Sequence, residues 1–127
     1  MSKQEAAITK KIEVWFAKTV DTSSPFEIKH TRGATRFNLR ELKKHQVDWL
    51  LACSSEKGCT WKIPDTGYGY NPFDCFHYKN APSYVVIAYP KWICAIHIQD
   101  IVVIGGSSLD EETAVQISAF KILTKEI

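Results

Sequence analysis

The spacing of apolar residues changes several times along the chain, and each change predicts a new element. Residues 3–18 carry apolar side chains three and four positions apart, from Ile8 through Ile12 to Phe16, which is the spacing of an amphipathic helix. Residues 84–89 are almost uniformly apolar, as is typical of a strand buried on both faces in the centre of a sheet. The chain therefore combines helical and extended segments.

Turn signals divide the rest of the chain into shorter elements. Further strands are expected at residues 26–32, 59–63, 73–78 and 92–98, the last continued by 101–104. Further helices are expected at residues 39–54 and 109–123, capped by Asn38 with Glu41 and by Ser108 with Glu111. This order predicts one α/β domain with a mixed central β-sheet flanked by helices. The strand–helix–strand unit of residues 26–63 is expected to be a right-handed crossover.

Composition adds a concentration of positive charge. The 127 residues have a net charge of +2, which alone does not indicate a nucleic-acid partner. Residues 27–45, however, contain only two acids and a basic cluster that could meet a phosphate backbone. The plainer interpretation of such a cluster is a solvated helix face and loop. Its members are Lys29, His30, Arg32, Arg36, Arg40, Lys43, Lys44 and His45.

The cysteines and the apolar runs predict an intracellular, cytoplasmic protein. None of the four cysteines belongs to a Cys-x-x-Cys pair or has a histidine at zinc-finger spacing. Cys75 and Cys94 are expected to be reduced core residues, and a Cys53–Cys59 pair across a turn is disfavoured by the same compartment argument. No apolar signal segment is expected at the start, and no apolar run approaches the ~20 residues of a membrane span.

Glu27 and Lys29 are the first candidates for chemistry. Residues two apart in a strand point to the same face, so this carboxylate and ammonium should share one side of the sheet, with Phe26 and Ile28 on the other. A carboxylate can hold Mg²⁺, and a lysine can steady the attacking water or the developing charge on a phosphate. Because Glu-x-Lys is a common tripeptide, the alternative is an exposed salt-bridged pair.

The surrounding residues resemble the PD-(D/E)xK nuclease superfamily and, within it, the RecU-type Holliday-junction resolvases and their phage relatives. The resemblance starts at residues 26–31, continues through the loop to residues 37–39 and ends in the segment 42–46, which contains His45 and Gln46. It implies a restriction-endonuclease-like core and a metal-dependent DNA endonuclease that uses Mg²⁺ or Mn²⁺. It also implies a homodimer that acts on branched or duplex DNA. The small size is compatible with a phage or mobile-element origin.

The resemblance assigns roles to individual residues. Glu27 would bind the metal, Lys29 would be the catalytic lysine, and Gln46 would orient water or metal ligands. The basic residues expected to contact nucleic acid are His30, Arg32, Arg36, Lys43, Lys44 and His45.

The second acid of the site is the main departure from the family pattern. The family places an aspartate on a strand just before Glu-x-Lys, whereas a helix and a breaker precede Glu27 in this chain. We hypothesise that Asp74 supplies it from downstream, in permuted order, if the strand of residues 73–78 lies beside that of residues 26–32. The alternative role for Asp74 is capping a turn. The other candidate acids are Asp65, Asp21 and Glu5, of which Glu5 also fits a capping box.

If no second acidic side chain lies beside Glu27, the sequence predicts a different class of function. One carboxylate alone holds Mg²⁺ weakly, whereas two carboxylates and a substrate phosphate complete its octahedron. Without the second acid, the chain would be a catalytically inactive nuclease-like fold that binds nucleic acid or a protein partner.

Overall fold

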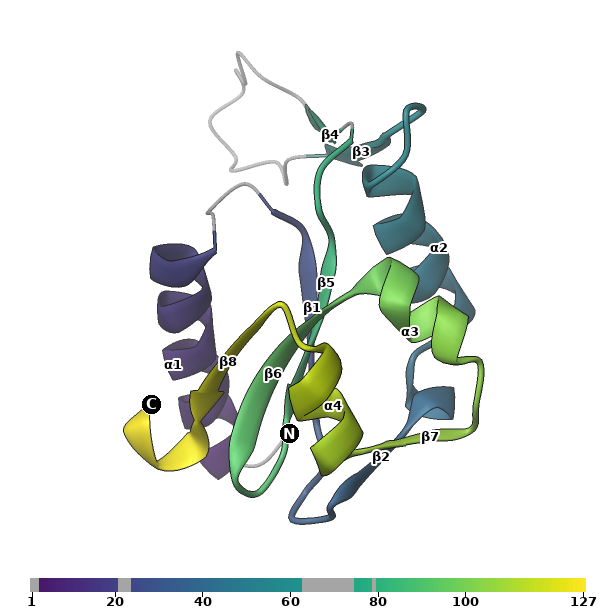
Figure 1. Ribbon diagram of the computed structural model, residues 1–127. Coiled ribbons are helices and arrows are strands. Elements are labelled where there is room, and N and C mark those ends of the chain that lie inside the picture. Colours follow the sequence, from purple (N-terminus) through teal and green to yellow (C-terminus); the bar gives the residue numbers. More distant parts are fainter. Residues whose placement is uncertain (1–2, 21–23, 63–74, 79) are drawn as a thin grey trace.

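A four-stranded mixed sheet forms the centre of the molecule (Figure 1). The computed structural model describes residues 3–20, 24–62, 75–78 and 80–127, and the side chains of residues 59–62 and 75–78 are outside the description. Within the sheet, β1 (Phe26–His30) pairs in parallel with β5 (Tyr84–Ala88). Next to β5 lies β6 (Trp92–His97), and next to β6 lies β8 (Phe120–Leu123), both in antiparallel pairings.

Helices cover both faces of this sheet (Figure 1). The long α1 (Lys3–Thr19) packs Ile12 and Phe16 against one face. The other face is covered by three shorter helices. These are α2 (Lys44–Cys53), α3 (Ile98–Ile104) and α4 (Glu111–Ile117).

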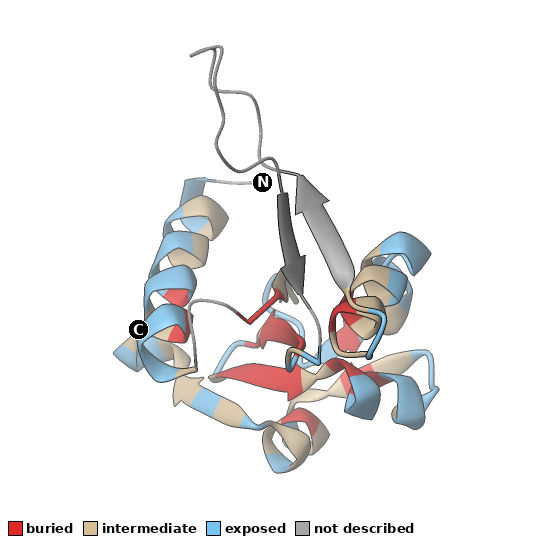
Figure 2. Ribbon diagram, turned by 90° about the horizontal axis from the view of Figure 1, so that it is seen from above, coloured by how far each residue is buried: buried red, intermediate tan, exposed pale blue. Residues whose placement is uncertain are grey.

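The alternation of side chains along β5 and β6 explains why both faces are apolar. Val85 and Ile87 point toward α2, while Tyr84 and Val86 point toward α1, and all four are buried. Figure 2 shows this burial running along the central strands and on the inward sides of the helices. A strand buried on both faces requires a continuous apolar run, which confirms the prediction of a central strand at residues 84–89.

Within the described residues, two small antiparallel sheets and two short 3-10 helices accompany the main sheet. β2 (Arg36–Asn38) pairs with β7 (Ser108–Asp110), and β3 (Cys59–Lys62) pairs with β4 (Cys75–Tyr78). The 3-10 helices are η1 (Leu39–Glu41), between β2 and α2, and η2 (Thr124–Glu126), after β8. The coarse prediction of an α/β fold with a mixed sheet flanked by helices is confirmed.

The helix predicted over residues 39–54 is interrupted. Asn38 caps only η1, through its side-chain oxygen and the backbone N–H of Arg40 at 3.0 Å. Leu42 and Lys43 are then extended, and α2 starts with half of a capping box, in which the Gln46 side-chain oxygen accepts from the backbone N–H of Lys43. The α-helix begins at this second cap, and not after Asn38, because the Gln46 side chain bonds to a strand as well as to the helix start.

Two predictions near the C-terminal end are wrong. Residues 101–104 continue a helix rather than a strand, because Ile98 and Ile101 both reach the core at helical spacing and Gly105 ends the turn with φ 62°. The helix predicted over 109–123 divides into β7, α4 and β8. Leu109 is buried in the pairing with β2, and Ser118 has an extended backbone that lets the chain join β6.

The predicted crossover through residues 26–63 is also wrong. In the described part of the chain, β3 pairs with β4 alone and does not join the main sheet. The parallel neighbour of β1 is β5, so the connection between these strands includes β2, η1, α2, β3 and β4.

The described cysteines behave differently from one another. Cys94 is a free thiol buried in the core, as expected, and burial raises its pKa to about 12. Cys53 is buried and disulfide-bonded, contrary to the expectation that a disulfide would be disfavoured. No helix in the described part of the chain has the length and apolar character needed to cross a membrane.

Candidate functional site

Glu27 and Lys29 lie on the face of β1 that points toward α2. Their partners across the parallel pairing are Val85 and Ile87, whose side chains are buried on that same face. Phe26 and Ile28 pack against the α1 side of the sheet. The predicted separation of the polar pair from its apolar neighbours is therefore confirmed.

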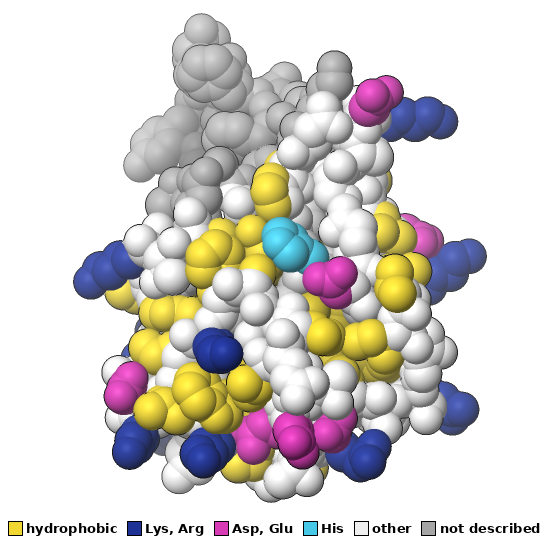
Figure 3. Space-filling model, viewed as in Figure 1, with side chains coloured by type: hydrophobic (Ala, Val, Ile, Leu, Met, Phe, Trp, Pro, Cys, Tyr) yellow, Lys and Arg dark blue, Asp and Glu magenta, His cyan; other side chains and the backbone are white. Residues whose placement is uncertain are grey.

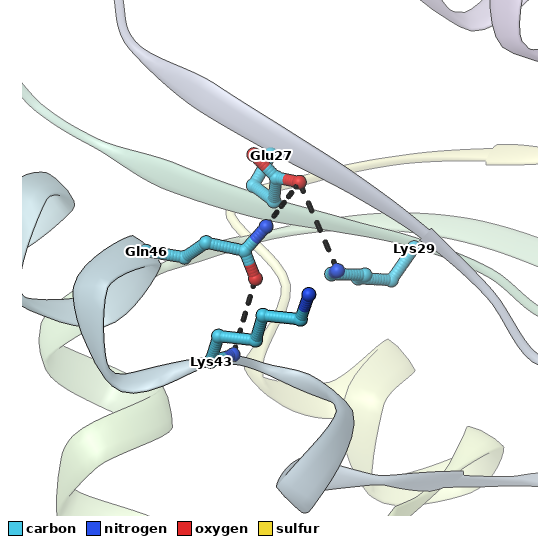
Figure 4. A network of polar contacts seen from close by, with 4 residues as sticks. All are labelled: Glu27, Lys29, Lys43 and Gln46. Carbon is cyan, nitrogen blue, oxygen red and sulfur yellow. Dashed lines mark hydrogen bonds and ion pairs between the residues drawn. The ribbon is translucent and has the colours of Figure 1, made fainter.

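Gln46 joins this polar pair to the beginning of α2 (Figure 4). Its side-chain oxygen accepts from the backbone N–H of Lys43 at 3.1 Å, and its Nε2 donates to Glu27 Oε1 at 2.9 Å. One amide thus satisfies a helix-start N–H and a strand carboxylate at the same time. The structure brings together three residues that the sequence assigned to one site.

One lysine lies beside the Glu27 carboxylate, and a second lies near the first. Lys29 Nζ lies 3.8 Å from Glu27 Oε1, and the two side chains are 20% and 35% exposed, respectively. Figure 4 shows the Lys43 side chain extending toward the Lys29 ammonium group. With one carboxylate and two ammonium groups, the local charge is positive, which suits a phosphate ligand.

The carboxylate of Glu27 keeps one oxygen for a further ligand. Within the described residues, both of its polar contacts fall on Oε1. The second oxygen is a hard donor of the kind that Mg²⁺ and Mn²⁺ take. Glu27 therefore fits a divalent cation as one ligand of a larger set.

The described residues do not supply the rest of that set. They contain no group of three His, Cys, Asp or Glu side chains that could hold a metal ion. Asp74, Asp65 and Asp21 lie outside the described residues. The strand after Asp74, β4, pairs with β3, and the sheet neighbour of β1 is β5, so the side-by-side arrangement hypothesised for Asp74 is wrong.

Glu5 has a different place from the one a metal ligand would need. It forms an ion pair with Arg32 at 3.5 Å, beyond the C-terminal end of β1. Within β1, His30 alternates with Lys29 and hydrogen-bonds Thr9 of α1 at 2.9 Å. Glu5, His30 and Arg32 thus form a separate polar group on the α1 side.

The predicted nucleic-acid residues consequently lie in three separate places. Lys43, Lys44 and His45 are exposed at the start of α2, next to the Glu27 site. Arg36 lies on β2 and donates to the Ser108 hydroxyl at 3.2 Å. His30 and Arg32 belong to the α1 side instead, because the strand alternation that directs Lys29 toward α2 directs His30 the opposite way.

Sequence reasoning missed two features around the site. It did not identify Lys43 as the N-cap of α2, although a glutamine three residues later is the signal of a capping box. It also missed the pairing of β2 with β7, which places Ser108 beside Arg36. Strands of three residues give little periodicity to detect.

Comparison with known proteins provides no counterpart for this site. No family model matches the chain, and neither a curated protein nor a solved structure matches it. The similarity of residues 26–46 to resolvase motifs therefore stays a prediction from the sequence. The chemistry has to be inferred from the geometry of Glu27, Lys29 and Gln46.

Replacing Gln46 by alanine should destabilise the fold by about 1–2 kcal/mol, because it removes the bond to Lys43 N–H and the bond to Glu27. Urea unfolding followed by circular dichroism measures the free energy of unfolding. The matched control is His45→Ala at the exposed neighbouring position, which should change it by less than about 0.5 kcal/mol. Equal effects of the two substitutions would show that the amide does not join α2 to β1.

We expect His30 to make stability depend on pH. Burial lowers the pKa of His30 and nearby Glu5 opposes the shift, so the folded state resists protonation below the unfolded pKa of about 6.5. The free energy of unfolding should be fully retained above pH 6.5 and should fall as the pH drops below it. His30→Gln should lose less stability than the wild type between pH 7.5 and 5.5 in urea titrations, and equal losses would refute the assignment.

Proposed function

We propose that this protein is a metal-dependent DNA endonuclease of the Holliday-junction resolvase type, with a restriction-endonuclease-like core. The observation that carries the proposal is the cluster of Glu27, Lys29 and Gln46, in which a strand carboxylate, a strand ammonium and a helix amide meet on one face of β1. Motif similarity and geometry here concern the same three residues. Branched DNA offers paired symmetric cuts, so the proposed active species is a homodimer.

In this proposal each residue has a defined task. Glu27 binds the divalent cation through its second oxygen, and Asp74 is the proposed source of the other carboxylate, although the strand that follows it does not lie beside β1. Gln46 holds Glu27 in place and keeps one carboxylate oxygen occupied. Lys29 donates to a nonbridging oxygen of the scissile phosphate and stabilises the charge that grows there during attack by water.

The cation supplies the part of the chemistry that side chains at neutral pH cannot. Mg²⁺ or Mn²⁺, when bound, lowers the pKa of a water and neutralises charge on the leaving oxygen. Lys29 and Lys43 place positive charge beside this position. The Glu27–Lys29 ion pair must loosen when a phosphate arrives, which suits its 3.8 Å separation.

A second candidate function rests on the same cluster. Among the described residues, Glu27 is the one carboxylate in contact with Lys29 and Gln46. A site with net positive charge and a single acid binds phosphate groups without a complete metal centre. The alternative is therefore a nuclease-like fold that binds nucleic acid or a protein partner without cleaving it.

Lys29→Ala should lower the cleavage rate by about 10²–10³-fold, the usual effect of removing one electrostatic stabiliser of a transition state. The assay uses four-way junction, duplex and single-stranded DNA with Mg²⁺, Mn²⁺ or EDTA. The matched control is Lys57→Ala, which removes an exposed lysine from the turn after α2. Equal activity of wild type and Lys29→Ala would reject the catalytic role. Wild-type protein that binds DNA but is inactive with every metal would favour the alternative function.

If Asp74 supplies the second carboxylate from a segment other than a strand beside β1, Asp74→Asn should abolish cleavage and leave the fold intact, because it removes the carboxylate and keeps the size of the side chain. Circular dichroism and unfolding measurements check the fold, and the same junction assay checks activity. Asp100→Asn, at an exposed position of α3, is the matched control. Full activity of Asp74→Asn would remove this residue from the site.

A further inference from the structure

A polar hollow of about 320 Å³ lies between the β2–β7 ribbon and η1. The ribbon directs Phe37 and Leu109 into the core, so that the alternate positions face outward. The hollow is lined by Asn38, Arg40, Ser107 and Ser108. Hydroxyl, amide and guanidinium groups at one place are hydrogen-bond donors that suit phosphate oxygens.

Arg40 is the described arginine that is available to a ligand. Arg32 pairs with Glu5 at 3.5 Å, and Arg36 donates to Ser108 at 3.2 Å. Arg36 also lies opposite Asp110, where a hydrogen bond from Thr113 and the nearby Arg36 charge hold the pKa of the Asp110 carboxyl below its usual range. In contrast, Arg40 is exposed and its guanidinium forms no ion pair within the described residues.

Arg40, which lines the hollow, is close in sequence to Lys43 at the candidate active site. Arg40 and Lys43 are three residues apart, so their Cα atoms are separated by at most about 10 Å. Lys43 extends toward the Lys29 ammonium (Figure 4). Because each strand of duplex DNA carries a phosphate about every 3.4 Å along the axis, this separation spans up to about three nucleotides.

We propose that the hollow at Asn38, Arg40, Ser107 and Ser108 is a second phosphate subsite, which holds the DNA backbone within about three nucleotides of the phosphate at Lys29 and Lys43. The proposal rests on the proposed function in that DNA is the ligand, but it does not depend on cleavage. Arg40 supplies the charge, and the serine hydroxyls and Asn38 amide fix the position of the phosphate. Arg32, in the same basic segment of the sequence, has no part in it.

The other lysine-rich surface of the described structure is less suited to a phosphate. Figure 3 shows hydrophobic side chains over α1, β8 and the C-terminal end, with Lys and Arg side chains beside and between them. The groove there, of about 470 Å³, has an apolar floor that includes Val14, Trp15 and Ile122. Its lining also includes lysines, but Glu126 and the apolar floor would leave a phosphate there beside a like charge and against apolar surface.

Two matched variants test the subsite, Arg40→Gln and Arg32→Gln, each of which removes one exposed arginine charge. Binding to duplex and four-way junction DNA is measured in EDTA between 50 and 200 mM salt, so that no strand is cut. Arg40→Gln should weaken binding about tenfold and reduce the slope of log K against log salt by about 0.9, the loss of one phosphate contact. Arg32→Gln should leave both quantities unchanged, and Arg40→Lys should restore the slope.

Each outcome separates the subsite from the proposed function. Equal effects of Arg40→Gln and Arg32→Gln, or a wild-type slope for Arg40→Gln, would overturn the subsite even if the wild type cleaves DNA. A reduced slope for Arg40→Gln with a wild type that never cleaves would support the subsite and reject the nuclease. If the wild-type protein bound neither duplex nor four-way junction DNA, both the subsite and the proposed function would be overturned. Circular dichroism of each variant confirms that exposed positions leave the fold unchanged.

Discussion

The side-chain amide of Gln46 is the contact on which the geometry of the site depends. It bonds at one end to the start of α2 and at the other to a carboxylate on β1. These two elements also meet through apolar packing, but apolar packing has no preferred direction. The amide supplies the direction, because its donor and acceptor must both be satisfied at fixed distances. The position of Glu27 relative to Lys43 follows from this single group, whereas strand alternation places Glu27 and Lys29 on the same face.

The placement of the helices adds a second constraint. α1 occupies one face of the sheet, and α2, α3 and α4 occupy the other, so polar side chains on β1 are accommodated only where a helix does not cover them completely. Glu27 and Lys29 lie beside the first turn of α2, where helix N–H groups and lysines are available. At the C-terminal end of the same strand, the His30 side chain lies on the α1 side and hydrogen-bonds Thr9. One strand therefore serves two chemically different environments.

The sequence predicted the elements that have strong periodicity and failed where two signals competed. The continuous apolar run of β5 and the helical stripe of α1 each admit one structure, and both were predicted. The segment from Asn38 to Gln46 contains two capping signals, and the choice between them depends on Glu27, which is distant in sequence. The sequence predicted Glu27 and Lys29 on one face because strand alternation is local, whereas Gln46 was predicted only from the resemblance to nuclease motifs. The sequence did not predict the difference between Arg32, which forms an ion pair, and Arg40, which forms none within the described residues. That difference depends on Glu5, which lies on a different element.

The parallel pairing of β1 with β5 fixes more than the order of strands. Glu27 stands opposite Val85 and Lys29 opposite Ile87, so two residues without a polar atom determine which face receives the charges. A slip of one residue would turn Glu27 and Lys29 toward α1, among Ile12, Phe16 and Val86, and would expose Phe26 and Ile28 in their place. Burying two charges in that apolar cluster would be costly, so the alternation of polar and apolar residues along β1 favours the observed register.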